Sequence, residues 1–384
     1  MIKKLNKETL KIISFFLFWR LALLVILIFA IKFIPLAQTD RFLGGGSINY
    51  QISPELFSWA NFDGEHYLSI AIFGYKGLEQ VFFPVFPMII SFFSTSFSSD
   101  LLSSLISSTI VGLIISNACF LLALLYLYDL LRLDFSSKFS FITLSLLIIF
   151  PTSFYFGALY NESLFLLLTV LAFLNARRGN WFLASVFASI SAGTRIFGII
   201  LLPALLIEAY LQKEYKKIFW LLLIPLGLGL YMYYQYLTVG DALAFYHLQD
   251  MVGEQRQANL VLLPQVYFRY IKMLTMVSPT NFIYQTIMLE FICGIVFFLL
   301  PLYGYFKKIR LSYLFFAFAG FLITTVQGSF SSVPRYVLVF FPSFIALTFL
   351  VNNFPKTIKV LFYLVMGVLL AIETSLFLRG YWIA

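Results

Sequence analysis

Long apolar runs separated by short polar turns make up most of this chain of 384 residues. A membrane-crossing helix needs roughly 17 to 25 mostly apolar residues. Runs near this length predict about eleven spans, at 10–36, 104–131, 139–156, 160–177, 181–194, 196–212, 217–238, 286–306, 312–328, 335–351 and 357–378. The short pair 181–194 and 196–212 is also compatible with one long broken helix. The pattern predicts an all-α polytopic membrane protein.

One apolar segment, 83–98, is ambiguous. Pro84 and Pro87 shorten the helix that it can form, because proline disrupts a helix interior. The remaining run is shorter than a span, which favours a re-entrant or interfacial segment. Whether it crosses the membrane is left open by its composition alone.

The basic residues decide the topology, because cytoplasmic turns are enriched in lysine and arginine. If 83–98 does not cross, every short turn on one side carries at least two basic residues. We take that side as cytoplasmic, which places the N-terminus inside, the C-terminus outside and much of the basic charge in the cytoplasm: Lys3, Lys4, Lys7, Lys11, Arg132, Lys138, Arg177, Arg178, Lys213, Lys216, Lys217, Lys307, Lys308, Arg310, Lys356 and Lys359.

Composition agrees with the hydrophobic pattern. The chain is 61% hydrophobic and 11% charged, whereas an average soluble domain is roughly a quarter charged. The net charge of +9 follows membrane topology and does not indicate a nucleic-acid partner. We predict a single membrane domain, 1–384, with a first outer loop at 37–103 and a second at 240–285. Cys119 and Cys293 lie in apolar runs and are expected to be buried, not paired or metal-binding.

The first long polar interruption, 57–87, contains the strongest candidate for chemistry. Asp63, Glu65 and His66 lie within four residues of sequence there. Asp63 and Glu65 are two apart and point to different faces of a helix, so we do not expect a close carboxylate pair. The hypothesis is that Asp63 is a general base and that the others bind substrate. The alternative is an ordinary solvated loop.

A second candidate group, Tyr160, Asn161 and Glu162, precedes an apolar run at the predicted outer face. A carboxylate at a helix N-terminus is stabilised by the helix dipole, so a capping role is one interpretation of Glu162. The other interpretation is that Asn161 and Glu162 hold substrate hydroxyls.

Two arginines lie at the edges of apolar runs. Arg195 separates two of them, and Arg335 begins another, where a cation opposes the helix dipole. An unpaired charge at membrane depth costs ~2.5 kcal/mol or more, so each needs a partner or a role. Both suit a bidentate phosphate, and the alternative for each is a salt bridge to a carboxylate. Arg20, inside the first span, is expected to face protein or to snorkel.

These polar groups all fall on the predicted outer side, which favours an outward-facing site. Four segments then resemble the PIG-V family of glycosylphosphatidylinositol mannosyltransferases and its bacterial relatives. FDGEHYLSIAIFGY with VFFPVFP is similar to the family's W/F-D-x-x-H-Y…GY…FFP-x-x-P signature. The other three are FPTSFYFGALYNESLF, SISAGTRIFGIILLP and SFSSVPRYVLVFFP, and the terminal FLRGYWIA also fits bacterial members.

The resemblance implies a GT-C fold, a polyprenyl-phosphate mannose donor and inversion at the anomeric carbon. It implies Asp63 as the catalytic base, with the substrate-binding residues Glu65, His66, Tyr160, Asn161, Glu162, Arg195, Arg335 and Tyr336. No metal site is expected, although Asp63 and Glu65 leave a divalent metal open. The resemblance to a bacterial-type member does not specify the acceptor, which we expect to be lipid- or glycan-linked. We expect the protein in a bacterial cytoplasmic membrane.

Two alternatives from other classes remain at this stage. A transporter or lipid flippase lines its path with intramembrane charges, and no acidic residue is expected at mid-membrane in a confident span, which counts against it. A non-catalytic subunit of a transferase complex has no need of the Asp63 carboxylate. The sequence has no HExxH, CxxC, Walker or GxSxG motif, so protease, NTPase and serine-hydrolase functions are unsupported.

Overall fold

The computed structural model describes residues 7–37, 50–97, 100–252, 261–281, 283–325 and 328–383. Within these ranges the chain forms helices and turns, and no strand. The prediction of an all-helical protein is therefore confirmed. Lys3 and Lys4 of the proposed cytoplasmic group lie outside the described residues.

Five helical segments in the described part are long and apolar enough to cross a membrane. They are α1 (Lys7–Phe33), α6 (Leu101–Leu131), η7 with α11 (Tyr215–Leu223 and Ile224–Val239), α15 (Ile283–Phe306) and α19 (Lys356–Leu378). A sixth candidate is a bent pair, Val333–Val339 and Phe341–Asn352. The chain is thus an integral membrane protein by its helices, and the count of eleven spans stays a prediction.

The other predicted spans coincide with shorter helices: α7 (Ser137–Ile148), α8 (Glu162–Arg177), α9 (Trp181–Thr194), η6 (Ile196–Ile200) with α10 (Leu201–Gln212), and α16 (Leu311–Thr325). The predicted helix 139–156 is wrong in its second half. It ends at Ile148 because Pro151 lies just beyond, and η5 (Ser153–Phe156) follows.

Two predicted spans are broken beside candidate site residues. Arg195 is extended, at φ −154° and ψ 150°, between α9 and η6. The stretch predicted as 335–351 divides into α17 (Val333–Tyr336), η8 (Val337–Val339) and α18 (Phe341–Asn352), and the two parts meet at 92°. Phe340 at the bend precedes Pro342 by two residues and has a non-helical φ and ψ. These breaks free polar groups from helical geometry at the edge of the core.

The first outer loop folds into short helices. They are α3 (Pro54–Phe57), η2 (Ser58–Ala60), α4 (Asp63–Phe73), η3 (Glu79–Val81), α5 (Val85–Ser94) and η4 (Thr95–Phe97). The second outer loop contains α12 (Ala244–His247), α13 (Gln249–Val252) and α14 (Leu263–Met276). Helix α5 with η4 is shorter than a span, as the two prolines predict.

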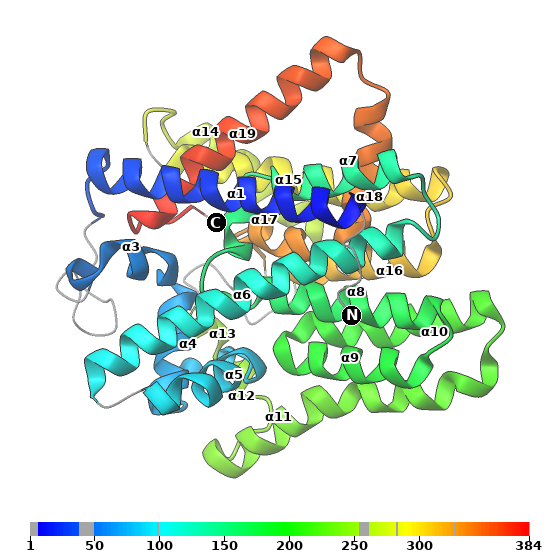
Figure 1. Cartoon of the computed structure of the whole chain (residues 1–384), viewed down its shortest axis with the longest axis horizontal. Helices are drawn as coiled ribbons and strands as arrows, with labels where there is room; N and C mark the ends of the chain where they lie inside the picture. The colour runs from blue at the N-terminus through cyan, green and yellow to red at the C-terminus, as the bar shows by residue number, and fades with distance from the viewer. Residues whose placement is uncertain are drawn as a thin grey trace.

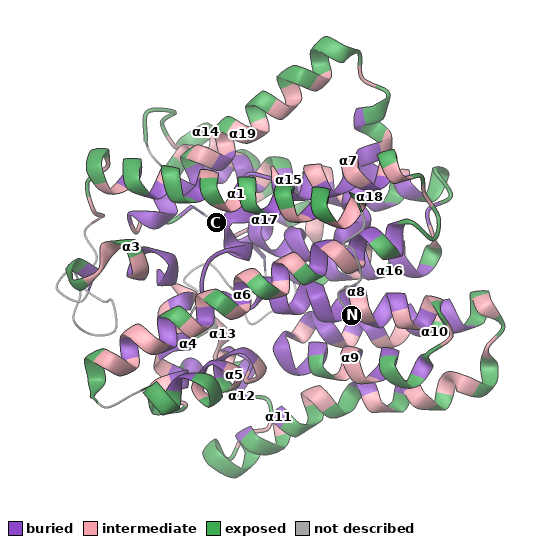
Figure 2. Cartoon of the chain, in the orientation of Figure 1, coloured by how far each residue is buried: buried purple, intermediate pink, exposed green. Residues whose placement is uncertain are grey.

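Helix α8 forms the centre of the bundle and packs against α6 and α9. It is buried on almost every side (Figure 2), whereas α1, α11 and α19 lie at the periphery with large apolar side chains exposed. A helix that is apolar all round is typical of a protein interior, and outward apolar faces are typical of contact with lipid. Arg20 on α1 faces protein as expected, with its guanidinium 4.3 Å from the Trp59 ring.

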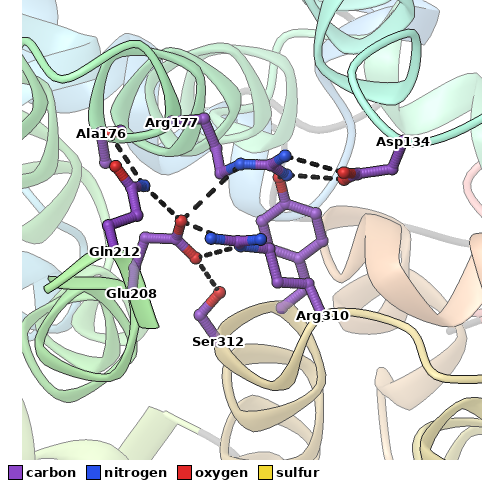
Figure 3. A network of polar contacts seen from close by, with 8 residues as sticks. Asp134, Ala176, Arg177, Glu208, Gln212, Arg310 and Ser312 are labelled. Carbon is purple, nitrogen blue, oxygen red and sulfur yellow. Dashed lines mark hydrogen bonds and ion pairs between the residues drawn. The ribbon is translucent and has the colours of Figure 1, made fainter. Parts of the chain in front are cut away.

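The ends of three helices opposite the outer loops share a polar network (Figure 3). The buried Glu208 carboxylate accepts hydrogen bonds from Arg310 Nε at 2.7 Å and from Ser312 Oγ at 2.6 Å. Arg177 binds Asp134 through both Nη atoms, at 2.6 and 2.7 Å. Because Arg177 Nε also lies 3.7 Å from Glu208, the two pairs connect α8, α10 and two turns.

The C-terminal segment folds back onto the start of the first outer loop. Arg379 Nε donates to the Ile34 carbonyl at 2.8 Å, and the Ala37 N–H donates to the Arg379 carbonyl at 2.8 Å. Tyr50 Oη hydrogen-bonds the Leu378 carbonyl. The α19 end is therefore in place to support the loop that carries Asp63.

Candidate active site

Asp63 begins α4 immediately after a strained backbone position. Phe62 has φ 58° and ψ −118°, in the half of backbone space that favours glycine. A non-glycine residue there costs of order 1–3 kcal/mol and persists only where the surroundings hold it. The strain turns the chain sharply, so that the carboxylate stands at the N-terminus of the new helix.

Contacts from distant segments hold this turn. Asn61 Nδ2 donates to the Phe377 carbonyl of α19 at 2.8 Å, and the Asn61 carbonyl accepts from Tyr160 Oη at 2.8 Å. The Phe62 ring lies 5.3 Å from the Trp382 ring in an edge-to-face arrangement. The C-terminal residues therefore fix the position of the catalytic candidate, and the Tyr160 hydroxyl is engaged in the same task.

Asp63 forms an ion pair with Arg335. Arg335 Nη1 donates to Asp63 Oδ2 at 2.6 Å. The Asp63 side chain is 26% exposed, whereas that of Arg335 is 5% exposed. The carboxylate is thus accessible from outside while its cationic partner lies inside the protein.

Three tyrosines surround the Arg335 guanidinium. The rings of Tyr155 and Tyr160 lie 5.5 Å from it, and that of Tyr336 lies 4.9 Å away, within the range of cation–π attraction. Arg335 Nη2 also donates to Tyr336 Oη at 3.2 Å. Arg335 Nε, however, is buried without a hydrogen-bond partner. An unused donor of this kind needs an explanation, and a bound ligand supplies one.

Glu162 joins the two arginines. Arg195 Nη1 lies 2.7 Å from Glu162 Oε1, and Arg335 Nε lies 3.6 Å from the same oxygen. Arg195 Nη1 also donates to Asn161 Oδ1 at 3.1 Å. Glu162 is the first residue of α8, and its carboxylate pairs with Arg195. Glu162 Oε2 is buried without a hydrogen-bond partner.

The result is a chain of alternating charge in the order Asp63, Arg335, Glu162 and Arg195. Breaking one buried ion pair leaves an uncompensated charge, and apolar residues often replace such pairs without loss of stability. Stability alone therefore does not account for two pairs meeting beneath the first outer loop. Two guanidinium groups, an accessible carboxylate and two unused polar atoms can bind an anionic substrate and take a proton from it or from its partner.

His66 lies one turn along α4 from Asp63 and pairs with Glu79. Its Nδ1 is 3.9 Å from Glu79 Oε1, and its ring stacks on Phe82 at 4.5 Å. Burial opposes the imidazolium, but the hydrogen bond to Glu79 and the charge of Asp63 outweigh it and raise the pKa of His66. The same bond lowers the pKa of Glu79 against the effect of burial. The pair with Glu79 thus favours the protonated form of His66 at the edge of the site.

Glu65 is the one sequence-predicted carboxylate placed apart. It follows Asp63 by two residues on α4, about 200° round the helix, so the helix directs the two side chains to different faces. No group of three or more His, Cys, Asp or Glu side chains in the described ranges is arranged to hold a metal ion. Metal dependence stays a prediction.

The structure brings seven of the candidate residues together: Asp63, Tyr160, Asn161, Glu162, Arg195, Arg335 and Tyr336. The salt-bridge alternative for both arginines is what the structure shows. Sequence reasoning missed three neighbours, Phe62, Glu79 and Tyr155. Tyr155 lies within FPTSFYFGALYNESLF, one of the segments that resemble the family, so the sequence contained a signal for it. Nothing local in the sequence identifies the strain at Phe62.

Two acidic residues lie inside candidate spans. Glu290 and Glu373 belong to α15 and α19, and both are buried. The expectation that no acidic residue lies at mid-membrane stays a prediction. Glu290 occurs eight residues into α15, after the second outer loop, and Glu373 lies near the C-terminal end of α19.

Residues 6–228 match a family described as mannosyltransferase (PIG-V). No curated protein matches the chain. Solved structures of the Archaeoglobus fulgidus oligosaccharyltransferase are similar at low level. Its complex with zinc and sulfate gives 15% identity and a TM-score of 0.42 over 91% of this chain and 50% of that one.

The apo form of the same archaeal enzyme gives 14% identity and a TM-score of 0.43, over 96% of this chain and 56% of that one. A third structure, tethered to an acceptor peptide, gives 15% identity and a TM-score of 0.43, over 95% of this chain and 55% of that one. This chain thus spans about half the length of the enzyme it is compared with.

Proposed function

Because the chain belongs to the PIG-V family of mannosyltransferases, we propose that it is a GT-C-type membrane glycosyltransferase with a polyprenyl-phosphate mannose donor. The acceptor is a hydroxyl of a lipid- or glycan-linked molecule. The reaction inverts the anomeric carbon and takes place at the outer face of a bacterial cytoplasmic membrane. The donor, the acceptor and the orientation are the parts that we propose.

The observation that carries the proposal is the charge chain that ends at Asp63. The acceptor oxygen attacks the anomeric carbon while the bond between that carbon and the donor phosphate breaks. Asp63 takes the acceptor proton as general base, and the electron pair of the broken bond leaves with polyprenyl phosphate. Among the four residues of this charge chain, Asp63 has the side-chain exposure to solvent that a general base requires.

The arginines act on the leaving group. Negative charge grows on the phosphate as the bond breaks, and preorganised cations stabilise that charge in a site with little water. Arg335 has an unused Nε–H, so it can bind a phosphate oxygen as well as Asp63. Arg195 compensates Glu162, and the unused Glu162 Oε2 can accept a hydrogen bond from a sugar hydroxyl.

Residues around this centre bind the substrates. His66, at the exposed edge, adds a positive charge when it is protonated, and its pair with Glu79 favours that form. Asn161 holds Arg195, and Tyr336 holds Arg335. Glu65, on another side of α4, suits contact with the acceptor. Because the arginines can neutralise the charge of the phosphate, the proposal does not require a resident metal.

One alternative from another class has an observation in its favour. Transporters use buried carboxylates within spans, and Glu290 and Glu373 are of that kind. The two classes differ in what they do to a labelled donor. A transferase converts the donor into a glycosylated acceptor and polyprenyl phosphate, whereas a flippase moves it between leaflets unchanged.

The test uses purified protein in liposomes with radiolabelled polyprenyl-phosphate mannose and extracted membrane lipids. Transfer of label to a new lipid or glycan supports the proposal. Labelled polyprenyl-phosphate glucose and galactose serve as parallel donors and establish the sugar. Movement of intact donor across the bilayer without transfer, for every donor, would replace the proposal with the flippase alternative.

A further inference from the structure

The turn that leads into α17 rests in a socket made by two other helices. Phe330 of this turn is fully buried. Its ring lies 4.9 Å from the rings of both Tyr267 and Tyr270 on α14. It also packs on Gly294 of α15, where an added Cβ would come within 2.8 Å of the ring. The second outer loop and α15 thus enclose the turn.

Glu290 is the polar centre of this socket. The Ser332 N–H donates to Glu290 Oε1 at 3.2 Å, and Tyr270 Oη donates to Glu290 Oε2 at 2.7 Å. Tyr270 Oη lies 3.2 Å from Ser329 Oγ as well. One carboxylate on α15 is therefore bonded to α14 and to the turn, with a different oxygen facing each.

The residue that Glu290 holds has a left-handed backbone. Ser332 has φ 63°, a conformation that a non-glycine residue keeps only when its surroundings require it. The Ser332 carbonyl accepts the N–H groups of Arg335 and Tyr336, both at 3.0 Å. The backbone direction at Ser332 therefore sets the start of α17 and the direction in which the Arg335 guanidinium points.

We infer that Glu290 is a positioning residue for Arg335, and that Tyr270 extends this control to α14. The inference rests on the proposed function for its effect on the reaction, but its structural part stands on the contacts alone. A displacement of about 1 Å in a catalytic group can cost roughly 10²-fold in rate. Loss of the Glu290 carboxylate is therefore expected to lower kcat more than it raises KM for the donor.

Two measurements on the full-length protein in detergent test this. Hydrogen–deuterium exchange reports the protection of 328–336, and the transfer assay reports kcat and KM. We expect Glu290→Ala to raise exchange in this segment and to lower kcat by about 10²-fold. Glu290→Gln keeps an oxygen for the Ser332 N–H and an amide that can donate to the Tyr270 hydroxyl. It is expected to retain protection and most of the rate.

A tyrosine pair supplies the matched control, and it decides the matter if Glu290→Ala does not fold. Tyr270→Phe removes the hydroxyl that binds Glu290 and is expected to lower kcat by about 10-fold, the value of one hydrogen bond. Tyr267→Phe removes a hydroxyl that donates to the Gly294 carbonyl at 2.8 Å and leaves Glu290 untouched. Its rate and its 328–336 exchange should match the wild type.

The outcomes separate the two proposals. Unchanged exchange and unchanged kcat in Glu290→Ala would overturn the positioning role. Equal losses in Tyr270→Phe and Tyr267→Phe would overturn the link through Tyr270. If the wild type transfers no sugar from any donor, the proposed function fails, while the exchange data still test the contact between Glu290 and the turn.

Discussion

Arg335 Nη1 lies 2.6 Å from Asp63 Oδ2, although 272 residues separate them in the chain. The first outer loop supplies the carboxylate and a broken helix near the C-terminal end supplies the cation. Neither segment contains the site alone, since the Phe377 carbonyl must also hold Asn61. The charge chain therefore joins both ends of the protein.

Lysine in place of arginine tests the geometry of the phosphate site. Arg335→Lys keeps the charge but loses the planar fork that serves Asp63, Tyr336 and Glu162 together. We expect kcat to fall by about 10² to 10³-fold, the usual cost of one transition-state donor. Arg178→Lys is the control, because Arg178 forms an exposed pair with Asp129 at 3.4 Å. Equal activity in Arg335→Lys and the wild type would contradict the assigned role.

The strained turn predicts an inverted order of two substitutions. Both Phe62→Ala and Phe62→Gly lose the contacts of the ring with Trp382 and Phe377. Glycine is normally less stable than alanine by roughly 0.5–1 kcal/mol, but at φ 58° it relieves the strain. We expect Phe62→Gly to be the more stable by about 1 kcal/mol in thermal unfolding. The usual order, alanine above glycine, would show that the backbone is not strained there.

The pH dependence of stability tests the pair of His66 and Glu79. The raised pKa of His66 means that its contribution is complete below the ordinary value of 6.5 and is lost as pH rises through the higher folded value. The lowered pKa of Glu79 means that its contribution is present above 4.5 and is lost as pH falls through the lower folded value. The pair therefore stabilises most between these limits.

The chain offers a matched control for this profile. It has two histidines, and His247 pairs with Asp241 at 2.7 Å on the exposed second outer loop. We expect His66→Gln to flatten the fall in melting temperature above pH 6.5, while His247→Gln leaves that fall in place. Identical profiles of melting temperature against pH for His66→Gln and the wild type would contradict a stabilising pair of His66 and Glu79.

The network in Figure 3 predicts a loss of stability without a loss of chemistry. Glu208→Gln removes the buried negative charge that pairs with the partly exposed Arg310, at a cost of about 3 kcal/mol. Asp134→Asn weakens a more exposed pair with Arg177 and should cost about 1 kcal/mol. Thermal unfolding gives both values. Activity per folded molecule should stay at the wild-type level, and its loss in Glu208→Gln would connect this network to the site.

The long helices could be predicted because a run of apolar residues has few alternatives to a helix in lipid. The break at Arg195 falls where the predicted spans 181–194 and 196–212 meet, whereas the predicted helix 139–156 runs through Pro151 and the structure ends it at Ile148. The 92° bend beside Phe340 could not be predicted, because it depends on how α17 packs over α15 and α16. Local sequence carries no record of such packing.

The candidate residues could be predicted one by one, because charges are rare in an apolar chain. Their partners could not. Asp63 and Glu65 are both carboxylates in the same polar segment, so the sequence alone does not distinguish them. The turn at Phe62 and the approach of Arg335 do. The sequence analysis did not single out Glu290 or Glu373, because one carboxylate in a long apolar run gives no sign of the residues that it contacts. The pairing of charges belongs to the tertiary structure.

The most direct test of the account compares Asp63→Asn with Glu65→Gln in sugar transfer from radiolabelled polyprenyl-phosphate mannose to membrane acceptors. Each substitution removes one negative charge from α4, so general effects of charge are matched. The account predicts that Asp63→Asn lowers kcat by about 10²-fold or more, the usual contribution of a general base, while Glu65→Gln keeps most of it. Full activity in Asp63→Asn, with loss in Glu65→Gln, would contradict Asp63 as the base.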